Sequence, residues 1–443
     1  MVKTLKFLFA VCMLSSMSAA LVSGSTISSG AGNINASLRW RKGTIKIGIS
    51  DSFLKRNVNL KTDSDVIGAI RRSLATWTKV TDIDLQESIS EKQNVSPSGN
   101  QGDGVSLITI AATPENLLLF SKSLQETAAT TRLFFDRKGF ITEADIVLNP
   151  YQQFSTDGTF GTFDLESTLT HEIGHLLGLD HSPVLSAVMH DNAGKNGVFG
   201  LQNFVPRTLA LTDIAAIRAK YGADIEDALE CCGAISGKIL RSSELVTRGV
   251  EIWAEEPESG KLVAETSTGA GGAFKLDGLP TGNYNIYAQR SGKLKINIPT
   301  QKIGNVFLES GDTSFLIKRL VDNAADFELK YLGFNGQLSG LPVPLNAGKS
   351  YTVYMGGRNI DKDQIYIGFS SPFLTCQPNT LINVDYGDGI SAVSFEVQVN
   401  ALTPIGEYTV FVESKVGMRQ AIVGGIAIRS FSNSFSNFIL PEN

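Results

Sequence analysis

Cysteine and histidine are scarce in this chain, which has four of each among its 443 residues. Cys12 lies in an apolar N-terminal stretch, which leaves Cys231, Cys232 and Cys376 for the rest of the chain. Three thiols cannot form a disulfide scaffold. The adjacent pair could belong to a metal or redox site. We favour the plainer alternatives, in which one member is bridged to Cys376 or all three thiols are reduced.

An excess of positive charge is also absent, because 39 Lys and Arg residues face 44 Asp and Glu residues and the net charge is -5. Without a basic footprint, we expect no nucleic-acid partner. Hydrophobic residues make up 42% of the chain and charged residues 19%, which is typical of globular rather than disordered proteins. The length is sufficient for about three domains.

A long apolar run is present only at the N-terminus. Lys3 and Lys6 precede an almost uncharged stretch from residue 7 to 22, and small residues follow up to Gly24. This order is typical of a cleaved signal peptide, which we assign to residues 1–24. The run is short and contains several serines, so we favour cleavage over the alternative of a membrane anchor helix. We therefore expect a secreted, extracellular protein with no transmembrane segment after cleavage.

The composition of the chain changes along its length. Residues 25–228 mix helix and strand patterns, whereas residues 233–320 and 325–430 contain short alternating strands separated by Gly and Pro. Each of the two later blocks has about the size of a β-sandwich. The tail, residues 431–443, gives no structural signal. The predicted fold class is multi-domain, with an α+β domain followed by two all-β sandwich domains.

Hydrophobic periodicity predicts the elements of the first domain. We expect helices at 63–80, 164–177 and 212–221, and strands at 38–50, 105–111, 130–136 and 141–149. Asp63 or Ser64 is the expected cap of the first helix. A tight turn at 137–139 joins the last two strands, so they should form a hairpin.

Three of the four histidines fall in one segment, HEIGHLLGLDH at 171–181. His171 and His175 are four residues apart, so on a helix they project from one face and can share a metal ion. Gly178 allows the helix to end in a left-handed turn, after which the chain can return and supply His181. Three neutral imidazoles leave the fourth position of a tetrahedral zinc ion to water, which is typical of a catalytic site.

Glu172 directly follows the first histidine, so its carboxylate can hydrogen-bond a zinc-bound water. Zinc lowers the pKa of that water from about 16 toward about 7. Glu172 can then accept the proton as hydroxide attacks a peptide carbonyl, and pass it to the leaving amine, while the metal stabilises the oxyanion. The alternative is a surface helix that carries histidines by chance, which the extended pattern HExxHxxGxxH disfavours.

The segment resembles the metzincin superfamily of zinc metallopeptidases and, within it, the matrixin (matrix-metalloproteinase-like) branch. His181 is followed by Ser182, as in matrixins, and Met189 stands at the offset of their Met-turn, a methionine packed beneath the zinc ligands. Residues 211–222 resemble the closing helix of the family and residues 38–50 its opening strand. Without this offset, Met189 would be read as an ordinary core residue.

The resemblance implies a metzincin catalytic domain with one catalytic zinc ion and protein or peptide substrates. It also implies that the first strand of the predicted hairpin forms a sheet edge onto which an extended peptide adds. The candidate substrate-binding residues are Thr130, Thr131, Arg132, Leu133, Phe134 and Phe135. The alternative is an ordinary half-buried strand. The loop at 191–207 should wall the pocket beside the scissile bond.

The sequence departs from the family in two respects. Many matrixins bind a second, structural zinc through additional histidines. His190 is the one histidine left for such a site here, so we expect the site to be absent. Many matrixins also have a propeptide whose cysteine blocks the catalytic zinc, and we expect no such cysteine latch in this chain. His190 could line the substrate pocket or hold the oxyanion, although we favour a solvent-facing loop position. Calcium is a further candidate ligand, through Asp136, Asp157 and Asp164, although turn and cap roles are favoured.

The two later blocks resemble known extracellular modules. Residues 235–289 resemble the carboxypeptidase regulatory-like, transthyretin-type sandwich, through the strand GVEIWA and the segment GAFKLDGLPTGNYNIYA. YTVYMGGRNI at 351–360 and PIGEYTVFVES at 404–414 resemble an immunoglobulin-like (IPT/TIG-type) domain. These resemblances imply adhesion or substrate recruitment through an extracellular ligand, with a passive spacer as the alternative.

Together these features predict a secreted zinc-dependent endopeptidase. One alternative is a cell-surface or extracellular adhesin with an inactive protease-like domain. Retention of His171, His175, His181 and Glu172 argues against it, because loss of any one of them would silence the site. Another alternative is a zinc hydrolase that acts on something other than protein.

Overall fold

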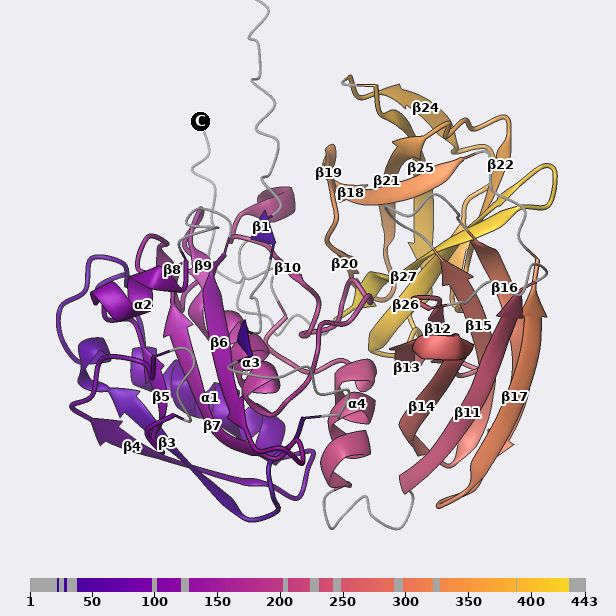
Figure 1. The fold of residues 1–443 in the computed structure, drawn as a ribbon. Coiled ribbons are helices and arrows are strands. Elements are labelled where there is room, and N and C mark those ends of the chain that lie inside the picture. Colours follow the sequence, from indigo (N-terminus) through magenta and orange to yellow (C-terminus); the bar gives the residue numbers. More distant parts are fainter. Residues whose placement is uncertain are drawn as a thin grey trace, which may run out of the picture.

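The computed structural model describes residues 22–23, 28–29, 38–97, 102–120, 127–201, 206–223, 231–241, 248–290, 298–321, 327–387 and 389–429. The predicted tail, and all but two residues of the predicted signal peptide, lie outside this set. No helix within these ranges has the length and apolar character needed to cross a membrane. A part that mixes helices with strands lies beside a strand-rich part, with helix α4 between them (Figure 1).

The first domain is built on a six-stranded sheet with the order β2-β6-β7-β5-β3-β4. The strands are β2 (Ser28–Ser29), β3 (Thr44–Ser50), β4 (Asp84–Ser90), β5 (Ser106–Thr109), β6 (Ala129–Phe135) and β7 (Ile141–Leu148). β6 and β7 are antiparallel, which confirms the predicted hairpin. β5 and β7 lie inside the sheet and are buried almost throughout, polar side chains included.

The three predicted helices are confirmed. They are α1 (Val66–Thr78), α3 (Leu165–Leu176) and α4 (Leu211–Tyr221), and a short helix that was not predicted, α2, spans Pro114–Leu118. The cap of α1 is neither Asp63 nor Ser64 but Asp65, whose carboxylate accepts a hydrogen bond from the N–H of Gly68. Prediction and structure differ here because several acidic and hydroxyl residues precede the helix, and backbone geometry selects among them.

Helix α1 packs against α3 through a buried contact. The indole of Trp77, which is fully buried, donates to the carbonyl of Thr170 at 2.8 Å. Ser73 donates to the carbonyl of Glu166 at 2.9 Å. Both helices contribute to the apolar core that they share with the sheet. This packing fixes the position of α3, the helix that carries the first two histidines.

The described residues beyond α4 form two modules, each with its own apolar core. The first β module (residues 231–321) has the sheets β14-β11-β17 and β13-β12-β15-β16. Its strands are β11 (Cys231–Arg241), β12 (Glu251–Glu255), β13 (Leu262–Ser267), β14 (Ala273–Pro280), β15 (Gly282–Arg290), β16 (Ile298–Leu308) and β17 (Thr313–Leu320).

The second β module (residues 327–429) has the sheets β19-β18-β21-β25-β23, with β24 also paired to β25, and β20-β27-β26-β22. Its strands are β18 (Glu328–Phe334), β19 (Gln337–Ser339), β20 (Val343–Leu345), β21 (Ser350–Arg358), β22 (Ile365–Phe369), β23 (Leu374–Cys376), β24 (Ile382–Asp385), β25 (Ser391–Val399), β26 (Gly406–Ser414) and β27 (Arg419–Ile428). The predicted change to strand-rich structure after the first domain is confirmed.

A shared apolar cluster joins the first domain to both β modules. Its buried members are Val184, Ala187 and Ala210 from the first domain, Trp253 and Leu262 from the first β module, and Phe411, Ala421 and Val423 from the second. The ring of Trp253 stacks on Tyr287, and Tyr287 in turn contacts Phe411. The three parts therefore exclude water from a common centre rather than being connected by linkers alone.

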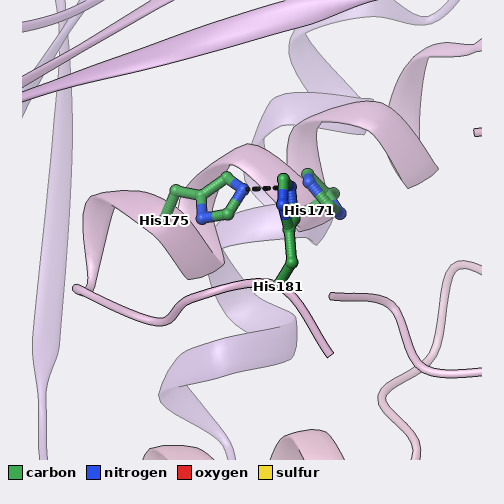
Figure 2. A group of neighbouring side chains, drawn as sticks. All are labelled: His171, His175 and His181. Atoms are coloured by element: carbon green, nitrogen blue, oxygen red, sulfur yellow. Dashed lines mark hydrogen bonds between the residues drawn. The ribbon is translucent and has the colours of Figure 1, made fainter. Parts of the chain in front are cut away.

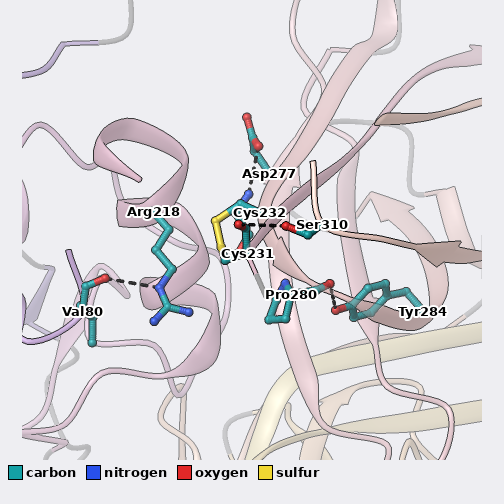
Figure 3. Close-up of a disulfide and its surroundings, with 9 residues drawn as sticks. Val80, Arg218, Cys231, Cys232, Asp277, Pro280, Tyr284 and Ser310 are labelled. Carbon is teal, nitrogen blue, oxygen red and sulfur yellow. Dashed lines mark hydrogen bonds between the residues drawn. A yellow bond between two sulfur atoms is a disulfide. The ribbon is translucent and has the colours of Figure 1, made fainter. Parts of the chain in front are cut away.

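The cysteines are arranged differently from our expectation. Cys231 and Cys232 form a disulfide with each other, and Cys376 is a free, half-buried thiol whose pKa is raised by burial. The reason is separation: the disulfide lies at the start of β11 beside α4, near Arg218 (Figure 3), whereas Cys376 ends β23 in the other β module. Ser310 donates to the carbonyl of Cys231 at 3.2 Å.

Candidate metal centre and active site

Helix α3 and the turn that follows it bring three histidines together. Gly178 has a φ of +87°, and its N–H donates to the carbonyl of His175 at 2.8 Å. This left-handed residue reverses the chain, as the sequence predicts, and His181 returns to face the helix (Figure 2). The potential ligand atoms of His171, His175 and His181 lie within 4.8 Å of one another.

The outer ring nitrogens fix the direction of two imidazoles. His171 Nδ1 lies 2.7 Å from the carbonyl oxygen of Val188, and His175 Nδ1 lies 2.8 Å from that of Leu179. A carbonyl oxygen can only accept, so each Nδ1 carries the hydrogen and each Nε2 keeps its lone pair for a metal.

The spacing of the inner nitrogens fits zinc. Nε2 of His175 and Nε2 of His181 are 3.1 Å apart. Two nitrogens bound at 2.0–2.1 Å to one tetrahedral zinc ion would be about 3.3 Å apart. With the potential ligand atoms of all three residues within 4.8 Å of one another, the imidazoles form a donor set suited to a single zinc ion.

The protonation state of the histidines also suits a metal. Burial, followed by the nearby His181, lowers the pKa of His171 to about 4. Burial likewise lowers the pKa of His175 well below its usual value, and to a smaller extent that of His181. All three imidazoles are therefore neutral at pH 7, which is the form that binds a metal.

Glu172 lies beside the histidines and is held by the neighbouring strand. Its side chain is buried, and its carboxylate accepts a hydrogen bond from the hydroxyl of Thr131 at 2.6 Å. Thr131 lies on β6, so the strand proposed for substrate contacts the residue proposed for catalysis. This threonine hydroxyl fixes the orientation of the Glu172 carboxylate.

Met189 packs against α3 beneath the histidines. Its sulfur lies so close to the helix that a Cβ built on Gly174 would be 2.2 Å from it. The backbone N–H groups of Val188 and Met189 both donate to Asp213 of α4, at 2.8 and 3.1 Å. Sequence reasoning missed Asp213, because a carboxylate in the first turn of a helix is an ordinary capping residue and does not reveal a distant partner.

Comparison with known proteins agrees with this geometry. Residues 39–222 match the model of the matrixin family. These residues form a matrixin domain. The chain is 32% identical over 193 residues to Metalloendoproteinase 1 of Glycine max, covering 42% of this chain and 53% of that protein. It is 27% identical over 202 residues to Metalloendoproteinase 1-MMP of Arabidopsis thaliana, covering 42% and 46%.

The relatives match part of this chain rather than its whole length. The chain spans about half the length of the two curated relatives. Among solved structures, the major pilin subunit of Bacillus cereus is 16% identical, with a TM-score of 0.18, and covers 43% of this chain and 66% of that chain. A TM-score this low carries no structural argument.

A cavity in the matrixin domain opens beside His171 and Glu172. As expected, the loop at 191–207 contributes to its wall, through Asn192, Gly194 and Pro206. Leu341 and Pro342 of the second β module also line the cavity. No pattern in the sequence could have identified these two residues, because their contact depends on how the module packs against the matrixin domain.

His190 is not the solvent-facing residue that we expected. Its side chain is 10% exposed and lines the cavity. Its Nδ1 donates to the carbonyl of Ser182 at 3.1 Å, and the amide of Asn192 lies 3.3 Å from its Nε2. The chain from Ser182 to His190 closes into a loop in which these two residues pair. The ring of His190 is therefore turned inward.

The candidate substrate strand β6 is not the outermost strand of the sheet. Ser28 and Ser29 of β2 pair in parallel with Arg132 and Leu133. In addition, β1 (Val22–Ser23) pairs with β10 (Asn192–Ala193), whose Asn192 lines the cavity. The physical reason is that a free strand edge presents unpaired N–H and C=O groups. Here a segment of the same chain, β2, pairs with that edge of β6. From Thr130 to Phe134 the side chains are buried, and Phe135 is half-buried.

The three aspartates considered for calcium make turn, cap and ion-pair contacts. Asp136 accepts from the N–H groups of the turn that follows it, and Asp157 accepts from Thr159. Asp164 caps α3 and forms an ion pair with Arg207. Within the described part of the chain, the histidine group is the only cluster of three or more ligands that could hold one ion.

Proposed function

We propose that this protein is a secreted zinc-dependent endopeptidase whose matrixin domain hydrolyses peptide bonds. The observation that carries the proposal is the convergence of three neutral imidazoles beside a buried glutamate at the edge of a cavity. The metalloendoproteinase names of the relatives support the same activity. The N-terminal apolar run supports secretion.

In this mechanism His171, His175 and His181 hold the zinc ion. When bound, zinc lowers the pKa of the attacking water and polarises the scissile carbonyl. Glu172 accepts the proton of the water and delivers it to the leaving amine. Thr131 keeps the carboxylate pointed toward the site through its 2.6 Å hydrogen bond. Met189 supports the histidine-bearing helix from below.

Substrate would bind as an extended strand along Thr130, Thr131, Arg132, Leu133, Phe134 and Phe135. The pairing of β2 with β6 supports this position, because a peptide would use the same backbone groups. Such a peptide would take the place of Ser28 and Ser29. The contact between Thr131 and Glu172 places this strand next to the proposed catalytic carboxylate.

The two β modules would be a carboxypeptidase regulatory-like sandwich and an immunoglobulin-like sandwich. Each has two sheets and its own apolar core, which supports this assignment. Their proposed role outside the cell is to recruit substrate or bind an extracellular ligand. We place the domain boundaries at 25–228, 233–320 and 325–430.

The decisive experiment compares the wild type with Glu172→Ala, and with Glu115→Ala as a control at an exposed glutamate. Zinc content and cleavage of casein or gelatin are measured for all three. We expect about one zinc ion per chain throughout, and proteolysis reduced by at least about 100-fold only in Glu172→Ala. Unchanged proteolysis in that variant would contradict the role of Glu172. Stoichiometric zinc without turnover on a broad peptide library would favour the adhesin alternative.

A further inference from the structure

The cavity beside the proposed zinc site has a wall that does not belong to the matrixin domain. Leu341 and Pro342, on the segment between β19 and β20, line it together with His171 and Glu172. Leu341 is only 5% exposed, so its side chain is enclosed between the module and the cavity. The second β module therefore reaches the site at which substrate would be cleaved.

Direct contact joins this wall to the loop that the sequence assigns to the pocket. A Cβ built on Gly194 would lie 2.6 Å from Cδ1 of Leu341, far inside van der Waals contact. Because Gly194 has no side chain, the loop and the Leu341 side chain can approach this closely. The two surfaces are thus fitted to each other at the edge of the cavity.

Phe199 anchors the same loop in the second β module. It is fully buried in the core of that module, and its ring packs edge-on against Phe334. Its N–H donates to the side chain of Gln337 at 2.7 Å, and Asn335 donates to its carbonyl at 2.8 Å. Phe199 has a φ of +58°, which a side-chain-bearing residue adopts only where the surroundings determine it.

The loop on the other side of the cavity is held by the same module. The N–H of Leu185, which also lines the cavity, donates to the carbonyl of Val423 on β27 at 3.2 Å. Gly424 lies so close that a Cβ there would be 2.5 Å from Val184 and 2.6 Å from the hydroxyl of Ser186. Both loops that bound the cavity are therefore fixed against one module.

We propose that the second β module is part of the specificity pocket of the protease, and that Leu341 sets the size of the peptide side chain accepted beside the scissile bond. This inference rests on the proposed endopeptidase function. The wall made by Leu341 and Pro342 is apolar, so the side chain that it contacts is an apolar one. Shortening Leu341 would deepen the pocket, and a larger residue would fill it.

The test uses the full chain and a library of peptides that vary one apolar position from Ala through Leu to Phe and Trp. We compare the wild type, Leu341→Ala and Leu341→Phe with Leu402→Ala, which changes an exposed leucine of the same module. Relative to Leu peptides, Leu341→Ala should raise kcat/KM for Phe and Trp peptides by about 10-fold or more. Leu341→Phe should shift the preference toward Ala, and Leu402→Ala should match the wild type.

A binding measurement separates pocket size from loss of structure. In a Glu172→Ala background, which should not cleave, the dissociation constants of Leu and Phe peptides are measured with and without Leu341→Ala. Leu341→Ala should strengthen the binding of Phe peptides relative to Leu peptides, with zinc content and circular dichroism unchanged. If Leu341→Ala and Leu341→Phe are folded and active and show the same peptide preference as the wild type, the inference about Leu341 is overturned. The proposed endopeptidase function would still stand. A zinc-loaded wild type that neither binds nor cleaves any peptide overturns the proposed function as well.

Discussion

Gly174 lies in the last turn of the histidine-bearing helix α3, directly before His175, and its substitution tests whether Met189 supports that helix. A Cβ added at this position would meet the sulfur of Met189 at 2.2 Å and an edge carbon of Trp77 at 2.9 Å. Both distances are shorter than the van der Waals contact distance between two non-bonded atoms of these types. Trp77 is fully buried and Met189 is 2% exposed, so neither side chain has free space into which to move.

The expected magnitude follows from two opposing effects of Gly174→Ala. Alanine favours a helix interior over glycine by about 1 kcal/mol. Overpacking of a filled core costs about 1–3 kcal/mol, and two rigidly enclosed neighbours favour the upper end of that range. The free energy of unfolding should therefore fall by roughly 1–2 kcal/mol, with a Tm lower by roughly 2–8 °C.

The assay is thermal unfolding together with zinc retention on dialysis, for Gly174→Ala, Met189→Ala and the double variant. Met189→Ala removes the obstructing sulfur, so the new methyl group should cost at least about 1 kcal/mol less in that background. A Gly174→Ala variant that is more stable than the wild type and keeps its zinc would refute the reasoning. The higher helix propensity of alanine would then explain the change in stability, and contact with Met189 would play no part.

Further predictions concern the turn, the carboxylate and the metal. Gly178→Ala forces a φ of +87° on alanine and places its Cβ 2.4 Å from the carbonyl oxygen of Leu38. We expect thermal unfolding to show a loss of at least about 1 kcal/mol of stability, and dialysis to show faster loss of zinc. Thr131→Val removes the hydrogen bond to Glu172 and should lower kcat/KM roughly 10-fold to 100-fold at unchanged zinc content, whereas Thr131→Ser should remain near wild type; equal rates for both variants would exclude the positioning role. A chelator should abolish cleavage of casein and lower the Tm, and zinc but not calcium should restore both; recovery with calcium alone would contradict the assigned metal.

The sequence by itself determined the local structure and the identity of the proposed chemical groups. Periodicity located α1, α3 and α4, and a tight turn located the β6–β7 hairpin, because these elements depend on neighbouring residues. The spacing of His171 and His175, with Gly178 ahead of His181, was sufficient to predict that the three side chains meet. Helix geometry and one left-handed turn fix that arrangement within a short segment.

Tertiary packing alone decided the surroundings of that segment. His190 turns inward because of its contact with Ser182, and Cys231 pairs with its neighbour while Cys376 lies in another module. Leu341 reaches the cavity from a strand-rich module whose sequence carries no sign of it. The contact of Leu341 with the cavity joins residues far apart in the chain, so it depends on how whole domains fit together and leaves no periodic trace in the sequence.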